Sequence, residues 1–229
     1  MNKKIYVIII LFISFLTFSN TLFMDFISDD VPAIVLNDFI KNYKNITSFF
    51  ISGITHTKPV HYRPLVYTSL AIDYLFWGLN PLGFHLTNVI LHTANSILFF
   101  LIMLKLTGLN LLISFLTTSL FSVYPIHSDL VAWIMARADL FCAFFLLLSF
   151  FFYLKYKEIK KPTFLLWSLV TFIFSLLSKE IAVMFIFILI IYELLFFEKQ
   201  KREIFKLLII FSIPIILFLI ARANFLPQF

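Results

Sequence analysis

The chain has 229 residues, of which 62% are hydrophobic and 13% charged, and its mean hydropathy is +1.01. Soluble domains are about half apolar and about a quarter charged, so a water-soluble domain is excluded. One cysteine and four glycines exclude a disulfide scaffold and a collagen-like fibre, and the apolar excess excludes a disordered chain. The net charge of +6 does not indicate nucleic-acid binding, because the basic residues separate apolar runs instead of forming one basic face.

Seven apolar runs along the chain predict transmembrane helices. Crossing the hydrocarbon core takes about 17 to 25 apolar residues in a helix, and Gly108, Pro125, Pro162 and lysine-rich patches separate the runs. The first run would alternatively be a secretory signal peptide, although no small-x-small cleavage site precedes Met24. We predict an all-α polytopic membrane helical bundle of about seven transmembrane helices, at residues 5–24, 84–105, 109–124, 138–155, 163–178, 181–197 and 204–221.

The distribution of basic residues predicts the orientation of these helices. With a cytoplasmic N-terminus, eleven of the 18 Lys and Arg residues fall in inner loops and seven outside, as the positive-inside rule requires. The segment 25–83 then becomes a long first external loop, and loops of this length are functional or form small substructures. Residues 65–79 within it have amphipathic spacing and aromatic content, which predict a helix lying along the membrane interface.

Unexpected polar residues collect on the predicted outer side of this integral, multi-pass protein. Ionisable groups near the hydrocarbon are costly unless they are paired or hydrated, so their convergence on one face predicts a functional site there. The group comprises Asp29, Asp30, His56, His61, Arg63, His85, His127, Asp129, Arg137, Asp139, Lys179, Glu180 and Arg222.

Charged residues that stand close together in the sequence admit two interpretations. Near Pro32, Asp29 and Asp30 would be a solvated loop pair or the N-cap of a following helix. Alternatively, repulsion between the two carboxylates separates their pKa values, so that one serves as an ionised base and the other as a protonated partner or metal ligand. A local ion pair between Arg137 and Asp139 is compatible with their spacing but not required by it.

Other polar residues also have plain structural interpretations. Lys179 and Glu180 would form an interfacial loop between two apolar runs, and Arg63 would be an anchor at the membrane surface. His85 and His92 are seven residues apart on one helical face, so they would be metal ligands or packing and hydrogen-bonding residues.

The sequence contains none of the motifs of soluble catalysis: no Gly-rich phosphate loop, no G-x-S-x-G, no H-E-x-x-H and no paired cysteines. Six ordered blocks instead resemble the GT-C superfamily of polytopic glycosyltransferases, and most nearly the transmembrane and tetratricopeptide-repeat-containing O-mannosyltransferases and their bacterial relatives. The blocks are FISDD at 26–30, HYRPL at 61–65, GFHLTNVILH at 83–92, YPIHSDLVAWI at 124–134, RADL at 137–140 and LSKE at 177–180.

The resemblance implies a membrane enzyme that transfers a hexose, with inversion, from a polyprenyl-phosphate carrier to a protein or glycan acceptor on the outer side of the membrane. It also implies that an acidic residue of the first external loop, Asp29 or Asp30, is the catalytic base. A carboxylate can accept the acceptor's proton during attack on the anomeric carbon, and Arg or Lys can stabilise the departing phosphate. The implied phosphate-binding residues are His61, Arg63, His127, Arg137 and Lys179, supported by His85, Asp129, Asp139 and Glu180.

The cofactor requirement stays open at this point. Two carboxylates with neighbouring histidines suit either metal-free chemistry or a divalent cation such as Mg or Mn, and the relatives differ in this respect. Asp29 or Asp30 would be the ligand of such a cation. The expected partners are the lipid-linked sugar, the acceptor and the bilayer, and not nucleic acid.

Members of the family that the chain resembles carry more spans and a soluble C-terminal region, whereas this sequence ends at Phe229. We expect residues 1–229 to form a single transmembrane module. A fragment, a truncated gene product and a minimal member of the family are the alternative interpretations of this module. The alternatives to an enzyme are a non-catalytic transporter or lipid-handling protein and an inactive remnant of a larger transferase. A transporter would carry polar residues through its spans, but the third, sixth and seventh runs are almost purely apolar, which favours the enzyme.

Overall fold

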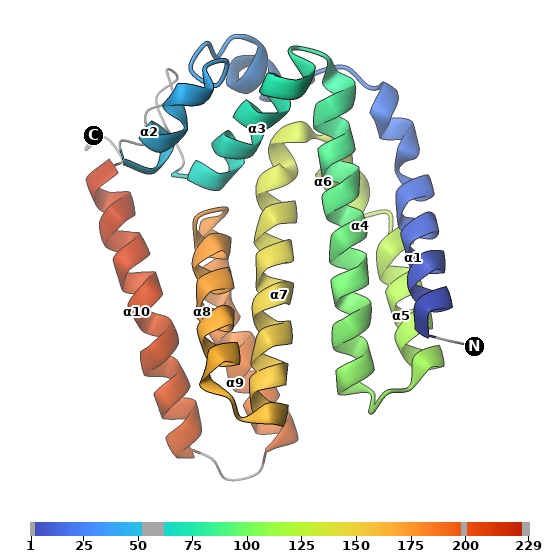
Figure 1. Ribbon diagram of the computed structural model, residues 1–229, viewed down its shortest axis with the longest axis vertical. Helices are drawn as coiled ribbons and strands as arrows, with labels where there is room; N and C mark the ends of the chain where they lie inside the picture. The colour runs from blue at the N-terminus through green and yellow to red at the C-terminus, as the bar shows by residue number, and fades with distance from the viewer. Residues whose placement is uncertain (1–2, 52–61, 198–200, 226–229) are drawn as a thin grey trace.

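The computed structural model describes residues 3–51, 62–197 and 201–225, and Figure 1 shows long helices lying side by side with shorter ones across one end. No strand occurs in these residues, so the predicted all-α fold is confirmed. The α-helices are α1 Lys3–Thr17, α2 Ile46–Ile51, α3 Pro64–Trp77, α4 Pro81–Leu106, α5 Leu111–Val123, α6 His127–Ala132, α7 Arg137–Ile159, α8 Pro162–Leu176, α9 Phe185–Phe196 and α10 Lys201–Phe225. Short 3₁₀ or π segments are η1 Ser19–Phe23, η2 Val31–Val35, η3 Tyr43–Asn45, η4 Ile134–Ala136 and η5 Glu180–Met184.

All seven apolar runs contain helix, but their lengths differ. Three helices are long and apolar enough to cross a membrane by length and composition, at Pro81–Leu106, Ile134–Ile159 and Ile204–Asn224. Leu111–Val123 and Pro162–Leu176 are shorter apolar helices. A helix of 15 residues, such as α1, spans only about 22 Å, less than the roughly 30 Å of hydrocarbon. The structure therefore supports a helical membrane bundle, and the number of seven spans stays a prediction.

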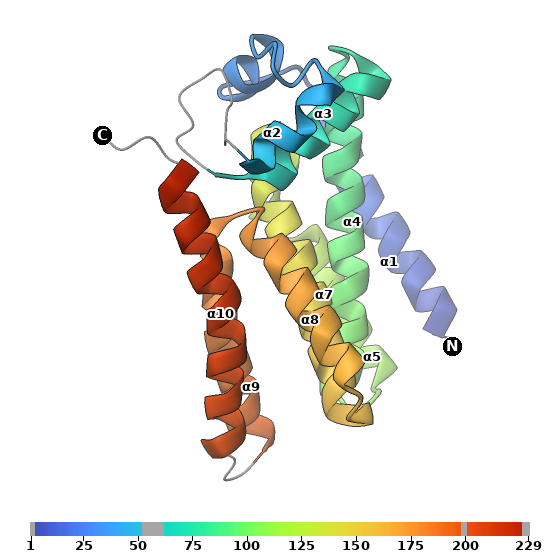
Figure 2. The same cartoon turned by 60° about the vertical axis from the view of Figure 1, so that its left-hand side comes forward.

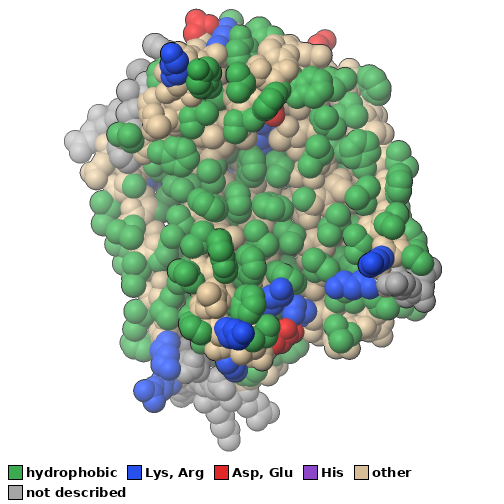
Figure 3. Space-filling model, in the orientation of Figure 1, with side chains coloured by type: hydrophobic (Ala, Val, Ile, Leu, Met, Phe, Trp, Pro, Cys, Tyr) green, Lys and Arg blue, Asp and Glu red, His purple; other side chains and the backbone are tan. Residues whose placement is uncertain are grey.

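The surface of the bundle fits a membrane environment. Figure 3 shows hydrophobic side chains covering the broad middle of one face, with Lys and Arg gathered mainly at the end opposite the short helices. The hydrophobic side chains exposed on the long helices include Phe12, Ile90, Leu120, Leu166 and Ile216. Because these side chains would be costly in water, their exposure indicates contact with lipid.

Local sequence signals explain where several helices begin and end. Asn80 and Asn110 cap α4 and α5, with side-chain oxygens that accept hydrogen bonds from the backbone N–H groups two and three residues onward. Pro81 and Pro162 occupy the first position of α4 and α8, where a missing N–H costs nothing. Lys160 ends α7 in the left-handed conformation. These signals set the positions of the interhelical turns.

The described part of the segment 25–83, predicted as the first external loop, forms a small substructure across one end of the bundle (Figure 1). Helix α3 forms within the stretch predicted at residues 65–79 and leaves Ile72, Leu75 and Phe76 exposed; its place along the membrane interface stays a prediction. Its Trp77 ring packs directly against the backbone of Gly83, where a Cβ atom would clash. The apolar core beneath comprises Ala33, Ile34, Ile40, Phe49, Val66, Leu70, Ala71, Phe84, Ile134 and Ala138.

Small polar residues hold the central helices together. Helix α7 packs along α8 and α4, and α4 also packs against α1 and α5. Ser149 of α7 and Ser168 of α8 exchange hydrogen bonds of 2.7 to 3.0 Å through their hydroxyl and carbonyl groups. Ser175 donates to the carbonyl oxygen of Cys142 at 2.9 Å. Short side chains let helix backbones approach closely, which is typical of packing within membranes.

Candidate active site

The segments that carry the predicted site residues lie at the end of the bundle covered by α2 and α3, as both ribbon views show (Figure 1, Figure 2). The N-terminal ends of α4 and α7 and the turn between α8 and α9 reach this same end. His56 and His61, by contrast, lie outside the described residues. Helices far apart in the sequence thus bring most of the predicted polar residues to one end of the molecule.

Asp29 and Asp30 occupy one turn but have opposite environments. Asp30 is fully buried, and its carboxylate accepts hydrogen bonds from the backbone N–H groups of Met135 at 2.9 Å and Ile27 at 3.2 Å. Asp29 is exposed, and its side chain has no hydrogen-bond or ionic partner among the described residues. Asp30 makes no side-chain capping bond to η2, so the N-cap interpretation is wrong for it. The turn therefore anchors one carboxylate and presents the other to the outside.

The Asp30 carboxyl holds this turn together. Burial raises its pKa above the usual range, although the N–H groups of Ile27 and Met135 and the charge of Arg137 oppose the rise. Ser28 has a φ angle of +48°, a left-handed conformation that costs a non-glycine residue about 1–2 kcal/mol. Strained turns of this kind persist where the surroundings over-determine them, and they cluster at functional sites.

A pocket lies between the turn at 27–30 and α6, and Ser28, the neighbour of Asp29 in the chain, is part of its lining. Its volume is about 380 Å³, within the range of small-molecule sites. The lining is mostly apolar and comprises Met24, Ile27, Ser28, Asp129, Ala132 and Trp133. Asp129 is the carboxylate of the lining and is exposed, as expected for a residue that supports the site.

Trp133 is a site residue that the sequence did not reveal. Its indole N–H is buried and has no hydrogen-bond partner in the described part of the chain. A buried donor normally finds a partner, and this unpaired donor belongs to a residue that lines the pocket. Its only signal in the sequence is its place within the block at 124–134.

Arg137 lies in a buried polar network, away from the open pocket. Its guanidinium forms an ion pair of 2.6 Å with Asp73 and donates hydrogen bonds to the Asn88 side chain at 2.8 Å, the Phe84 carbonyl oxygen at 2.7 Å and Ser69 at 3.2 Å. The local pair with Asp139 that the spacing allowed does not form. Since these partners occupy the guanidinium, binding of a lipid phosphate by Arg137 would require their exchange, and this role stays a prediction.

The partners of Arg137 were not among the predicted site residues. Asp73 also accepts a hydrogen bond of 2.8 Å from Thr87, and Asn88 donates to the carbonyl oxygens of Val131 and Trp133 at 3.2 and 3.1 Å. The network therefore joins α3, α4 and the segment that leads into α7. Asp73, Asn88 and Arg137 are 15 to 64 residues apart along the chain. The sequence therefore gives little sign that these three side chains meet.

Two surface ion pairs join the remaining predicted residues. Arg63, at the start of α3, lies 3.4 Å from both carboxylate oxygens of Glu180. Lys179 donates to both oxygens of Asp139 at 2.6 and 2.7 Å. The pairs link the first external loop and α7 to the turn before η5, so Lys179 and Glu180 are more than a loop between two apolar runs.

The pair between Arg63 and Glu180 predicts a pH dependence of stability. Burial alone would raise the pKa of Glu180, but its own backbone N–H, Arg63 and Arg222 outweigh this and hold the pKa below its ordinary value of 4.5. A carboxyl with a lowered folded-state pKa stabilises the fold above its unfolded pKa, and this contribution is lost as the pH falls through the folded pKa. We expect the melting temperature of the purified chain to fall with acidification, and the fall to be smaller in Glu180→Gln. An equal fall in both proteins would contradict this assignment.

The described histidines His85, His92 and His127 pack against rings and backbone. The His92 Nε2 atom lies 3.0 Å from the carbonyl oxygen of Ser122, and its ring contacts that of His127 with centroids 5.2 Å apart. The His127 ring also packs on Phe121, and burial lowers its pKa. Its contacts are with aromatic rings and not with the charged pairs. His85 is fully buried against the backbone at Met24 and Asp25.

No group of three or more His, Cys, Asp or Glu side chains gathers among the described residues in a way that could hold a metal ion. His85 and His92 have separate neighbours, which fits the packing interpretation for both. Both oxygens of Asp30 accept backbone hydrogen bonds, and the metal requirement stays open.

Comparison with known proteins identifies relatives of the chain. It is 32% identical over 199 residues to the protein O-mannosyl-transferase tmtc2 of Xenopus laevis, covering 82% of this chain and 24% of that protein. The chain is related to the TMTC protein O-mannosyl-transferases. Mouse TMTC4 is 36% identical over 167 residues, which cover 64% of this chain and 22% of TMTC4. Mouse TMTC1 is 30% identical over 207 residues, which cover 83% of this chain and 22% of TMTC1.

The relationship to the TMTC proteins confirms the resemblance to O-mannosyltransferases and supports a glycosyltransferase. The chain spans about a quarter of the length of the TMTC proteins it matches. No family model matches the chain, and no solved structure matches it.

Proposed function

We propose that the chain forms the catalytic face of a membrane glycosyltransferase that moves a mannosyl or other hexosyl group from a polyprenyl-phosphate carrier to a hydroxyl group of a protein or glycan acceptor. The observation that carries this proposal is the turn at 27–30, where Asp30 is buried and anchored, Asp29 is exposed, and their neighbours Ile27 and Ser28 line a pocket of about 380 Å³. The TMTC relatives, named as protein O-mannosyl-transferases, support the same reaction class.

The chemistry assigns different roles to the two aspartates. Asp29 accepts the proton of the acceptor hydroxyl as the acceptor oxygen bonds to the anomeric carbon, while the bond from that carbon to the phosphate oxygen breaks with inversion. Asp30 does not meet the substrate and is a positioning residue, because backbone N–H groups engage both of its oxygens. The Trp133 indole N–H is free to donate to a sugar hydroxyl in the pocket.

The departing lipid phosphate requires positive charge near the membrane surface. Arg63 and Lys179 are the candidates, since both lie at this end of the molecule in partly exposed ion pairs. Their carboxylate partners, Glu180 and Asp139, hold them in place and can release them to a phosphate, which suits the bidentate geometry of Arg especially well. By the positive-inside rule this face lies outside the cytoplasm, with the N-terminus inside.

The test is turnover by the chain purified in detergent. We expect release of free lipid phosphate from a short-chain polyprenyl-phosphate mannose when an acceptor peptide rich in Ser and Thr is present, and no turnover of a nucleotide-linked mannose. Activity measured with and without EDTA distinguishes metal-free transfer from transfer that needs a divalent cation held by Asp29 or Asp30. Turnover of the nucleotide sugar alone would overturn the proposed donor.

A second outcome favours the alternative function. Binding of the lipid-linked sugar without release of lipid phosphate, with or without acceptor, would indicate a lipid-handling protein that uses the same pocket. The pocket lining is largely apolar, so binding by itself does not distinguish the two functions. Dependence of lipid-phosphate release on Asp29 distinguishes the transferase from the lipid-handling protein.

A further inference from the structure

The chain between α6 and η4 interrupts what would otherwise be one helix. At Trp133 the backbone is extended, with φ −84° and ψ 116°. In a continuous helix the N–H group of Met135 would donate to the carbonyl oxygen of Val131, four residues earlier. The interruption separates these two groups. Val131 is fully buried, and unpaired backbone groups in the interior are costly, so both groups need partners from elsewhere in the chain.

Two side chains replace the missing helical bond. The Asn88 Nδ2 atom donates to the carbonyl oxygens of Val131 at 3.2 Å and Trp133 at 3.1 Å. The N–H group of Met135 donates to Oδ1 of Asp30 at 2.9 Å. The interrupted segment is therefore bonded on one side to α4 and on the other side to the turn that carries the two aspartates.

We propose that Asn88 is a positioning residue for the transferase reaction. The segment that it holds forms part of the wall of the 380 Å³ pocket, through Ala132 and Trp133. The same segment anchors the turn at 27–30, named here the acidic turn, through the N–H group of Met135. Asn88 thus fixes the acidic turn relative to the pocket and acts through this segment. The inference rests on the proposed transferase function, because it concerns the placement of the proposed base.

The orientation of the Asn88 amide is fixed by a buried guanidinium. Its Oδ1 atom accepts a hydrogen bond of 2.8 Å from Nε of Arg137. A guanidinium has donors only, so the NH₂ group of the amide must point the other way, toward the interrupted segment. Arg137 is in turn held by Asp73 at 2.6 Å and by the carbonyl oxygen of Phe84 at 2.7 Å. Asn88 and Arg137 are both fully buried, so water does not compete for these bonds.

Loss of the Asn88 amide is expected to affect the reaction more than the fold. Without it, the interrupted segment has no side-chain bond to α4 at its two carbonyl oxygens. The segment and the acidic turn are then free to shift together relative to the helix. A displacement of about 1 Å at a reacting group can cost about 10²-fold in rate. A small local shift would therefore lower kcat strongly.

The test compares Asn88→Ser with a matched substitution on the same helix. Asn88→Ser shortens the side chain, so that it no longer reaches the two carbonyl oxygens, and keeps a hydroxyl group on the side of Arg137. The control is Asn95→Ser, about two turns further along α4. Asn95 is 2% exposed and donates to the carbonyl oxygen of Leu140 at 3.0 Å. The control therefore loses an equivalent buried amide contact outside the pocket lining.

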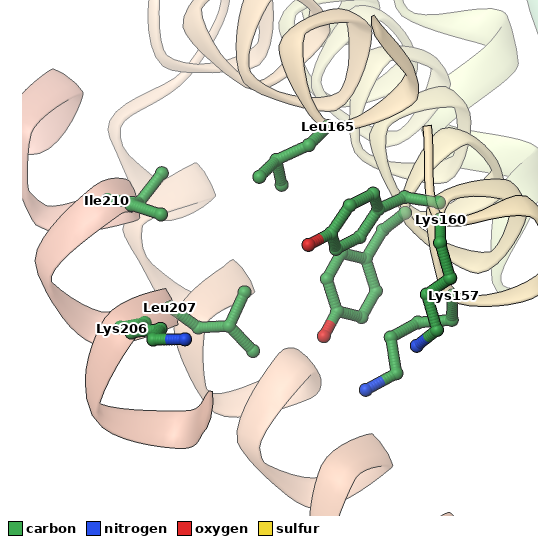
Figure 4. A pocket seen from close by; sticks show the side chains of 8 residues that line it. Lys157, Lys160, Leu165, Lys206, Leu207 and Ile210 are labelled. Carbon is green, nitrogen blue, oxygen red and sulfur yellow. The ribbon is translucent and has the colours of Figure 1, made fainter. Parts of the chain in front are cut away.

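A second control acts at the opposite end of the bundle. Tyr153 lies about 24 Å from the start of α7 and donates a buried hydrogen bond to Glu193. It lines a separate pocket of about 410 Å³, which Figure 4 shows with Lys157 and Lys160 on one wall and Lys206 on the other. Tyr153→Phe removes this hydrogen bond far from the acidic turn, so it reports the effect of lost stability alone.

Two measurements are made on each full-length protein in detergent, at a temperature equally far below its own melting temperature. Hydrogen–deuterium exchange without substrate follows the amides of residues 24–31 and 131–136. Release of lipid phosphate from polyprenyl-phosphate mannose at saturating donor and acceptor gives kcat. We expect Asn88→Ser to exchange about tenfold faster in both segments and to lose at least about tenfold in kcat. Both controls should stay within about twofold of wild type in each measurement.

Two results would overturn the proposal: exchange at the acidic turn that is equal in Asn88→Ser and Asn95→Ser, or fast exchange there with an unchanged kcat. If Asn88→Ser does not fold, Asn88→Asp takes its place, because it keeps the acceptor for Arg137 and the shape of the side chain but removes the NH₂ donor. A wild-type chain that releases no lipid phosphate would overturn the proposed function. The exchange measurement needs no substrate, so it would still decide whether Asn88 holds the acidic turn.

Discussion

Asp29→Asn should abolish sugar transfer while leaving the protein folded. A general base contributes about 10²–10⁴-fold to a rate, and an asparagine amide cannot take the acceptor's proton. Since the Asp29 side chain is exposed and has no partner among the described residues, the melting temperature should not change. The measurement is release of free lipid phosphate from polyprenyl-phosphate mannose, with donor binding followed in parallel. Binding should persist, because the substitution changes the chemistry and not the pocket.

Asp30→Asn is the matched variant, and we expect it to lower stability and to spare turnover. Asparagine can keep one acceptor for the Met135 N–H but directs an NH₂ group at the Ile27 N–H, which leaves two donors facing each other. A buried unsatisfied group costs about 1–3 kcal/mol, so this variant should melt earlier and retain turnover in the fraction that stays folded. Loss of turnover in Asp30→Asn with full activity in Asp29→Asn would reverse the assignment, and full activity in both would remove the acidic pair from the mechanism.

Arg137→Gln should lower the free energy of unfolding more than any substitution at the open pocket. Removing one member of a buried ion pair costs about 3–5 kcal/mol, because the other charge is left without compensation. Here the stranded group is Asp73, only 10% exposed, while Arg137 is not exposed at all. The measurement is unfolding in a mixed-micelle SDS titration. Arg137→Lys should recover little, because an ammonium cannot reach Asp73, Asn88 and the Phe84 carbonyl oxygen together.

A double-mutant cycle separates the pair from the rest of the network. Asp73→Asn alone leaves the Arg137 charge buried, whereas Asp73→Asn with Arg137→Gln removes both charges and should be less destabilised than the sum of the single variants. Coupling between contacting groups is typically about 0.5–3 kcal/mol. Additive effects would show that Arg137 and Asp73 act independently, contrary to their 2.6 Å contact.

The sequence by itself determined the class of the fold and grouped polar residues that the structure brings mostly to one end of the bundle. Apolar runs predicted the helices, since every backbone group in lipid must be bonded within its own segment, and prolines and asparagines marked where α4, α5 and α8 begin. The motif blocks correctly indicated relatives among the O-mannosyltransferases. These features are local, so they can be read from neighbouring residues alone.

Only the tertiary structure decided how the site residues divide among roles. Asp29 and Asp30 are chemically identical neighbours, and what separates them is the N–H of Met135, 105 residues away. Arg137 is fully buried against Asp73, and Arg63 meets Glu180 across 117 residues, for the same reason. Desolvation and hydrogen bonding depend on which atoms surround a side chain, and those atoms come from helices whose packing no local pattern specifies.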